Sequence, residues 1–136
     1  MKNLFLCFAL LSVVCFKNEH DLKCKDFHIG KFELVSKFDN RKYILDRKQN
    51  SQSEETFDLK TGKKIGNKRI YNLKWINDCE YILLIDTLKS KFDEADIYIN
   101  SNGGLKCRIF KIKNNSATIT TTFEDNSVES VISKIN

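Results

Sequence analysis

Residues 71–85 read YNLKWINDCEYILLI: apolar and polar residues alternate over 71–75, and after the short segment 77–79 the apolar run 81–85 has Tyr81, Leu83 and Ile85 on one parity. Side chains two residues apart lie on the same face of a strand, so the pattern predicts two antiparallel strands joined by a turn. The register that pairs the apolar residues has three cross-strand pairs: Trp75 with Tyr81, Leu73 with Leu83, and Tyr71 with Ile85. Each such pair stabilises a sheet by roughly 0.2 to 1 kcal/mol relative to alanine pairs.

The same alternation continues in both directions along the chain. We expect strands over residues 32–38, 43–47, 53–59, 69–76, 81–85, 97–100 and 105–113, and a further strand that begins near Ala117. Turn residues separate them: Asp39-Asn40, Thr61-Gly62, Gly66-Asn67, Asn102-Gly103 and Asn114-Asn115. The last turn pairs Ile112 with Ala117 and Phe110 with Ile119, and the adjacent Ile109 and Phe110 indicate a bulge. Helical spacing predicts short helices over 88–95 and 128–135.

About eight antiparallel strands in chain order form a meander, so the chain is assigned to the all-β class. A meander of this size buries its apolar faces by closing into a barrel or half-barrel, or alternatively by folding into a β-sandwich. The tripeptide Gly30-Lys31-Phe32 resembles the Gly-x-Trp opening of lipocalins, which favours a lipocalin-like barrel.

Length and charge limit the classes of function. The 136 residues suit one domain, and 23 basic against 18 acidic residues give a net charge of +5. The one local basic cluster comprises Lys60, Lys63, Lys64, Lys68 and Arg69, which is interpreted as a solvated loop. We therefore expect no nucleic-acid partner.

The N-terminus has the three-part plan of an export signal. A basic start at Lys2 precedes the apolar run 4–14, which is too short to span a bilayer, and then Cys15. We expect a signal peptide over 1–15, a flexible leader over 16–26 and one β domain over 27–136. Residues 11–15 resemble a bacterial lipoprotein box, which predicts a lipid on Cys15; cleavage after Cys15 to give a free secreted protein is the alternative.

Export favours disulfide formation, because thiols outside the cytoplasm meet oxidising conditions. Beyond Cys15, three cysteines remain: Cys24, Cys79 and Cys107. Cys24 and Cys79 lie at the ends of predicted strands and Cys107 within one, so we expect a Cys24–Cys79 disulfide. The pairs Cys79–Cys107 and Cys24–Cys107 are the alternatives.

Polar residues near one hairpin form the main candidate site. Arg47, Gln52 and Glu54 are expected to form a polar network or one wall of a ligand pocket, to which Trp75 and Tyr81 are added as candidate pocket residues. Glu54 and Glu55 point to opposite faces of a strand and cannot act as one acid/base pair, and both are expected on a solvated strand.

Metal binding, catalysis and cofactor binding have weak support in the sequence. His20, Cys24 and His28 do not have a standard ligand spacing, so we expect no metal site. No nucleophile elbow, phosphate-binding loop or dinucleotide fingerprint is present, so no catalytic residue and no cofactor is predicted.

Several of these residues together resemble a family of small exported bacterial proteins without an established activity. The resemblance covers residues 24–85, and its most specific element is Trp-x-Asn-Asp-Cys-x-Tyr over 75–81. Members have at times been labelled as topoisomerase IV subunits. A domain of this size behind an export signal cannot hold a DNA gate, a tyrosine nucleophile and a magnesium site, so we reject that label for this chain.

The functional expectation is an exported binding or interaction module of the bacterial envelope. It is expected to be a periplasmic or outer-membrane-anchored monomer that holds a small apolar ligand or contacts an envelope protein, with membrane attachment only through a lipid on Cys15. A structural envelope lipoprotein is one alternative. A hydrolase or metal-binding protein is another.

Overall fold

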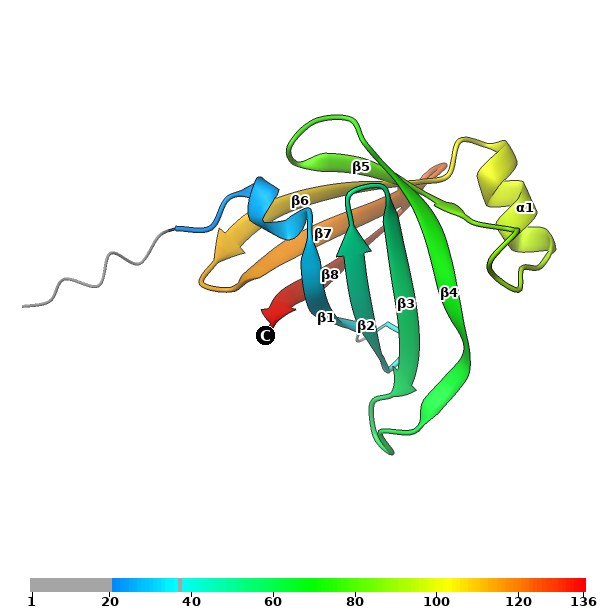
Figure 1. Cartoon of the computed structure of the whole chain (residues 1–136), viewed down its shortest axis with the longest axis horizontal. Helices are drawn as coiled ribbons and strands as arrows, with labels where there is room; N and C mark the ends of the chain where they lie inside the picture. The colour runs from blue at the N-terminus through cyan, green and yellow to red at the C-terminus, as the bar shows by residue number, and fades with distance from the viewer. Residues whose placement is uncertain (1–20, 37) are drawn as a thin grey trace, which may run out of the picture.

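Eight antiparallel strands close into a barrel in the computed structural model, which describes residues 21–36 and 38–136 (Figure 1). The strands are β1 Gly30–Ser36, β2 Arg41–Lys48, β3 Ser51–Asp58, β4 Lys64–Trp75, β5 Glu80–Ile85, β6 Leu105–Lys113, β7 Ser116–Phe123 and β8 Asn126–Ile135. Each strand pairs with the next, and β8 returns to pair with β1. The expected all-β meander and lipocalin-like barrel are confirmed, and the β-sandwich is not the fold.

The β4–β5 hairpin has the predicted register. Its pairs include Trp75 with Tyr81, Leu73 with Leu83 and Tyr71 with Ile85. Leu73, Tyr81, Leu83 and Ile85 are buried, because this face of both strands points into the barrel. The apolar alternation of the sequence therefore corresponds to the inward face.

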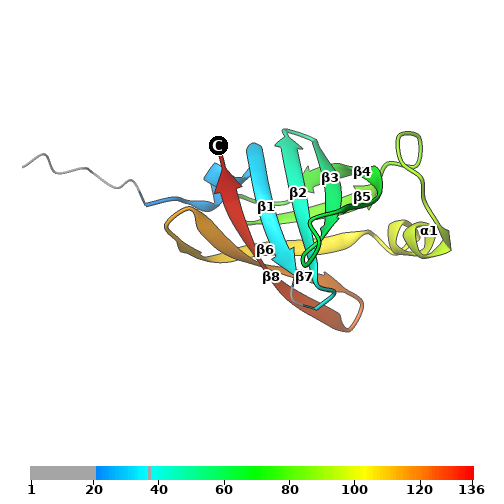
Figure 2. The ribbon, with the colours of Figure 1, turned by 90° about the horizontal axis from the view of Figure 1, so that it is seen from below.

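A 3-10 helix, η1 (Cys24–Phe27), covers one end of the barrel (Figure 2). Phe27 and Phe32 are fully buried there, with ring centroids 5.9 Å apart. The Lys134 ammonium donates to the carbonyl oxygen of Asp26 over 2.9 Å, which joins η1 to the end of β8. Residues 24–26 thus belong to the packed domain, which begins earlier than the expected boundary at residue 27.

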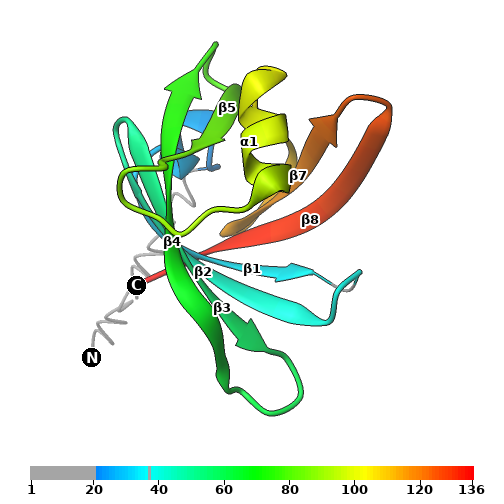
Figure 3. The ribbon, with the colours of Figure 1, turned by 90° about the vertical axis from the view of Figure 1, so that its right-hand side faces the viewer.

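The opposite end is the mouth of the barrel, and helix α1 (Glu94–Ser101) lies beside it (Figure 3). The Asn100 side chain hydrogen-bonds both backbone groups of Ile85 over 3.0 Å. The Tyr98 hydroxyl donates to Glu124 in the β7–β8 turn over 2.6 Å. These contacts hold α1 across the rim between β5 and the β7–β8 turn.

The prediction of a strand over 97–100 and of a helix over 88–95 was wrong, because the helix begins at Glu94 and contains Ile97–Asn100. Asp93 caps it: its carboxylate accepts from the Asp96 amide, and the Asp96 carboxylate accepts from the Asp93 amide. The segment 101–104 ends this helix and is not a hairpin turn.

Two other expectations are corrected at strands. The strand predicted from residue 69 begins at Lys64, because Gly66, with φ of +65°, makes a bulge inside β4 where a turn was expected. Residues 128–135 form part of strand β8, where a helix was predicted. Pairing with both β7 and β1 outweighs the helical spacing of its β-branched residues.

The β6–β7 hairpin contains the expected bulge with a different register. The Asn114-Asn115 turn is present, with Lys113 opposite Ser116. Lys111 has a φ of +47°, and the register shifts there, so Ile109 and not Phe110 faces Ile119. The shift places Ile109 in the core.

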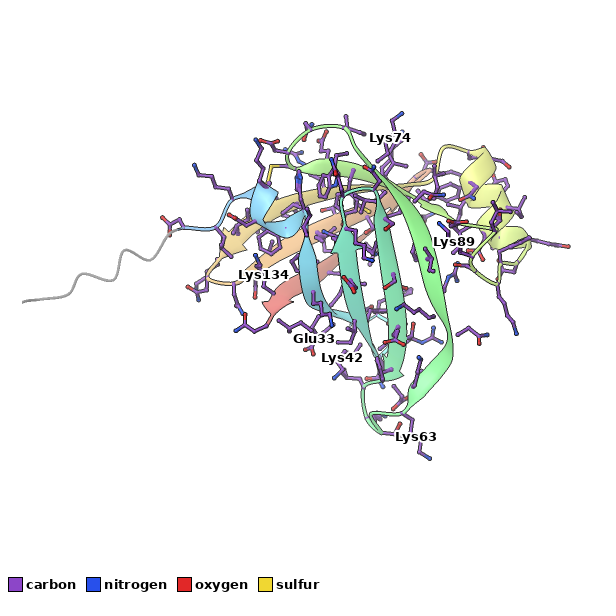
Figure 4. All side chains as sticks on the ribbon, viewed as in Figure 1. Glu33, Lys42, Lys63, Lys74, Lys89 and Lys134 are labelled. Carbon is purple, nitrogen blue, oxygen red and sulfur yellow. A yellow bond between two sulfur atoms is a disulfide. The ribbon has the colours of Figure 1, made fainter. Side chains whose placement is uncertain are left out.

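Charged side chains cover the outside of the barrel (Figure 4). Lys42 and Glu33 form an ion pair of 3.7 Å on the outer face of β1 and β2. Lys63 lies at the tip of the β3–β4 hairpin, and Lys60, Lys64 and Lys68 are exposed on the same hairpin. The four lysines of the predicted basic cluster thus form a solvated hairpin, whereas Arg69 is half-buried and pairs with Asp96 of α1.

Candidate functional site

Arg47 is buried at the covered end of the barrel interior, with 1% of its surface exposed. Its Nε donates to Gln52 Oε1 over 2.7 Å, one terminal nitrogen to the Phe27 carbonyl oxygen over 3.0 Å, and the other to the Tyr81 hydroxyl over 2.5 Å. The guanidinium also lies 4.6 Å from the Tyr81 ring centroid. All three nitrogens are therefore engaged by protein groups.

Gln52 is equally buried, and it lies opposite Arg47 in the β2–β3 register. The predicted Arg47–Gln52 interaction is present, and it ties β2, β3, β5 and η1 together. Glu54, the third member of the expected network, makes no hydrogen bond or ion pair with any residue of 21–36 and 38–136. It lies one inward position further towards the mouth.

A cavity of about 290 Å³ occupies the barrel interior between Arg47 and the mouth. Its wall is largely apolar and includes Leu34, Leu45, Leu83, Leu105, Ile119 and Val128. The charged residues that line it in the described part of the chain are Asp39, Arg47 and Glu54. The cavity therefore combines apolar side chains with a set of polar and charged groups, two features that small-molecule sites have.

The Glu54 carboxyl group lies on the wall of this cavity. Burial raises its pKa to about 7, although the positive charges of Arg69 and Arg47 oppose the rise. Glu55 points outward and pairs with Lys64 over 2.5 Å. The two carboxylates thus face opposite sides as predicted, but the expectation that Glu54 lies on a solvated face was wrong.

Two tyrosines line the same part of the cavity. The Tyr43 hydroxyl donates to the Asp39 carboxylate, and burial together with this hydrogen bond raises the pKa of Tyr43 to about 12. Burial and the negative charge of Glu54 raise the pKa of Tyr71 further. The Tyr71 hydroxyl has no hydrogen-bond partner among the described residues.

A second cavity, of about 200 Å³, lies under helix α1. It shares Tyr71, Leu83 and Leu105 with the interior cavity, so the two adjoin at the mouth. Arg69, which is opposite Glu54 in the β3–β4 register, lines this second cavity and pairs with Asp96 of α1. Arg69 therefore pairs with the helix, while its positive charge still acts on Glu54 from the neighbouring strand.

Trp75, which was expected in the pocket, lies at the covered end. Its ring stacks on His28 with centroids 3.5 Å apart and is tilted against Tyr81 at 4.7 Å. It borders a hollow of about 640 Å³ on the outer surface, which is formed largely by turn residues next to η1. Tyr81 alone of the two aromatic candidates lines the interior cavity.

The disulfide joins Cys24 to Cys79, the pair predicted, with Cα atoms 5.0 Å apart. Cys107 is a buried free thiol, and burial raises its pKa. The Cys24 sulfur is thus committed to the bridge, and the His28 ring bonds the Asp78 carbonyl oxygen over 2.7 Å. Within 21–36 and 38–136 no group of three metal-ligating side chains occurs. His20, the signal segment and Cys15 lie outside the described residues.

Comparison with protein-family models, with curated proteins and with solved structures gives no match. No helix in the described part of the chain is long and apolar enough to cross a membrane. The site therefore has to be interpreted from its own chemistry.

The sequence did not single out several residues of the cavity. Tyr43 and Tyr71 were placed in expected strands and not in the pocket, and Asp39 was expected only to form a turn. Tyr43 and Tyr71 are each two residues before a buried leucine of the same strand, Leu45 and Leu73. Residues two apart lie on the same face of a strand, so this spacing indicates that both tyrosines point into the barrel.

Proposed function

We propose that the protein is an exported binding module that holds a small, mainly apolar ligand inside the barrel. The observation that carries this proposal is the 290 Å³ cavity between Arg47 and the mouth. Ligand pockets range from about 300 to 1,000 Å³, and this cavity is at the lower limit, so the volume suits only a small molecule. The adjoining space under α1 extends the room available to a flexible chain.

Burial of the ligand's apolar surface is the source of affinity in this proposal. The leucine and isoleucine side chains of the wall remove apolar atoms from water, at about 25 cal/mol for each Å² buried. The buried Arg47 network maintains the shape of the covered end, so the ligand enters from the mouth. A structural envelope lipoprotein is the competing role, and it requires no ligand.

A cavity-filling substitution tests the binding role. Ser130 lines the cavity, whereas Ser127 is exposed on the outer face of the same strand, β8. We expect Ser130→Phe to weaken the binding of octanol, a neutral apolar probe, at least tenfold in calorimetric titration, because the ring occupies the cavity. Ser127→Phe should bind octanol as the parent does.

Failure of the parent protein to bind octanol, or equal binding by Ser130→Phe, would contradict the binding role and favour the structural one. Circular dichroism of both variants checks that the barrel remains folded. Native mass spectrometry of protein purified from its own host provides an independent measurement, because a retained ligand adds a defined mass.

We also propose export with a lipid on Cys15, which makes the protein a periplasmic or outer-membrane-anchored lipoprotein. The Cys24–Cys79 disulfide supports an oxidising compartment. The intact mass of the mature protein is expected to lack residues 1–14 and to include a diacylglycerol group. A mature chain without lipid would indicate the secreted form, and an uncleaved chain would refute export.

A further inference from the structure

We propose that the ligand of the interior cavity carries an ammonium head group that pairs with the Glu54 carboxylate and lies near the Tyr71 hydroxyl. This inference rests on the proposed binding function and specifies the chemical class of the ligand. It follows from which charged groups of the cavity already have partners and which do not.

The cationic residues near the cavity are already engaged. Arg47 uses each of its three nitrogens to hydrogen-bond Gln52, Phe27 and Tyr81. Arg69 pairs with Asp96 of α1 and lines the cavity under α1, not the interior cavity; its Nε has no hydrogen-bond partner among the described residues. An anionic head group in the interior cavity would have to displace the contacts of Arg47, the one arginine that lines this cavity among the described residues, so the cavity does not favour a carboxylate or phosphate ligand.

The two acidic residues of the cavity differ in whether they have a direct hydrogen-bond partner. Asp39 accepts the hydrogen bond of the Tyr43 hydroxyl at the rim. Glu54 lies deeper on the wall and makes no hydrogen bond or ion pair within the described residues, and the charges of Arg69 and Arg47 act on it without a direct contact. A carboxylate in a largely apolar cavity without a partner is costly, and a bound cation removes that cost.

An ammonium group matches the acceptors at this position. It has three N–H donors and no acceptor, whereas the cavity presents the Glu54 carboxylate and the oxygen of Tyr71 from the adjacent strands β3 and β4. The apolar residues towards Ile119 and Leu105 then contact the hydrocarbon part of the ligand. Charge-assisted hydrogen bonds of this kind are roughly twice as strong as neutral ones.

The charge state of Glu54 makes binding depend on pH. Burial raises its pKa to about 7, with Arg69 of β4 and Arg47 of β2 lowering it and Asp39 of the β1–β2 turn raising it. Above pH 7 the carboxylate is ionised and can pair with a cation. Below pH 7 the carboxyl group is neutral, so affinity for an ammonium ligand should fall as the pH decreases.

Three probes that share a hydrocarbon chain and differ in the head group test the inference: octylammonium, octanol and octanoate. Each is titrated calorimetrically between pH 5.5 and 8.5. A primary ammonium has a pKa near that of lysine, about 10.4, so octylammonium stays charged throughout. At pH 8 we expect octylammonium to bind about 10-fold or more tightly than octanol, with octanoate weakest. The preference for octylammonium should decline below pH 7.

The matched variants are Glu54→Gln and Glu55→Gln, which change neighbouring carboxylates on opposite faces of β3. Glu54→Gln should weaken octylammonium binding about 10- to 100-fold at pH 8 and remove its pH dependence. Glu55→Gln should bind all three probes as the parent does.

Tighter binding of octanoate than of octylammonium, or equal binding of octylammonium and octanol, would overturn the inference. Binding of octanol in the same experiment would still support the proposed binding function. The absence of binding by all three probes would overturn both proposals. An unchanged octylammonium affinity in Glu54→Gln would place the cation elsewhere and also refute the assignment.

Discussion

Loss of the Cys24–Cys79 disulfide is expected to lower the free energy of unfolding by about 4 kcal/mol. The bridge closes a segment with a sequence separation of 55 residues, and the chain-entropy relation gives this value for a loop of that length. The measurement is urea denaturation of the Cys24→Ser/Cys79→Ser double variant against the parent. Small domains have a total stability of about 5 to 15 kcal/mol, so the effect is a large fraction of it.

Reduction provides the control. Dithiothreitol should lower the urea midpoint of the parent towards that of the double variant and leave the double variant unchanged, because Cys107 forms no disulfide. A double variant with the parent's midpoint would show that the bridge contributes little to stability.

Replacement of Arg47 by alanine is expected to destabilise the fold by about 3 to 5 kcal/mol. The substitution leaves three buried acceptors without their donor: Gln52 Oε1, the Phe27 carbonyl oxygen and the Tyr81 hydroxyl oxygen. It also leaves a void beneath Phe32, over whose ring the guanidinium lies at 5.4 Å. Thermal and urea denaturation measure the loss.

Lys48 is the matched control, because it is the next residue of β2 and is exposed. Lys48→Ala should change stability by no more than about 0.5 kcal/mol. Arg47→Lys retains the charge but not the planar fork of donors, so it should recover only part of the loss. Equal stability of Arg47→Ala and Lys48→Ala would mean that the buried network has no net stabilising effect.

Strict alternation was the reliable signal in this sequence. It predicted the β4–β5 register pair by pair, because a shift of one residue would have exposed Leu73 and Leu83. Alternation gave the wrong structure for helix α1. None of the residues of this helix is buried, so the sequence has no apolar helical face that would indicate a helix. Ile97 and Ile99 are spaced as in a strand, and only the Asp93 and Asp96 caps distinguish the segment.

The candidate site was predicted only in part, and the reason is again the lack of an apolar pattern. The strand 51–58 reads SQSEETFD and has almost no apolar alternation, so nothing in it marks Gln52 and Glu54 as inward. Their place follows from the closure of the barrel, which turns one face of every strand to the interior. The bulge at Lys111 likewise depends on a positive φ that lysine rarely adopts.

Closure by β8 also sets the order in which the protein can fold. Every other pairing joins neighbours along the chain, whereas β1 meets β8 across about a hundred residues, as in the pair Lys31 with Ile135. Contacts so distant in sequence have a high entropic cost and slow the folding reaction. Since both bridging cysteines precede residue 80, the covalent link can form while the sheet is still open, before β8 pairs with β1.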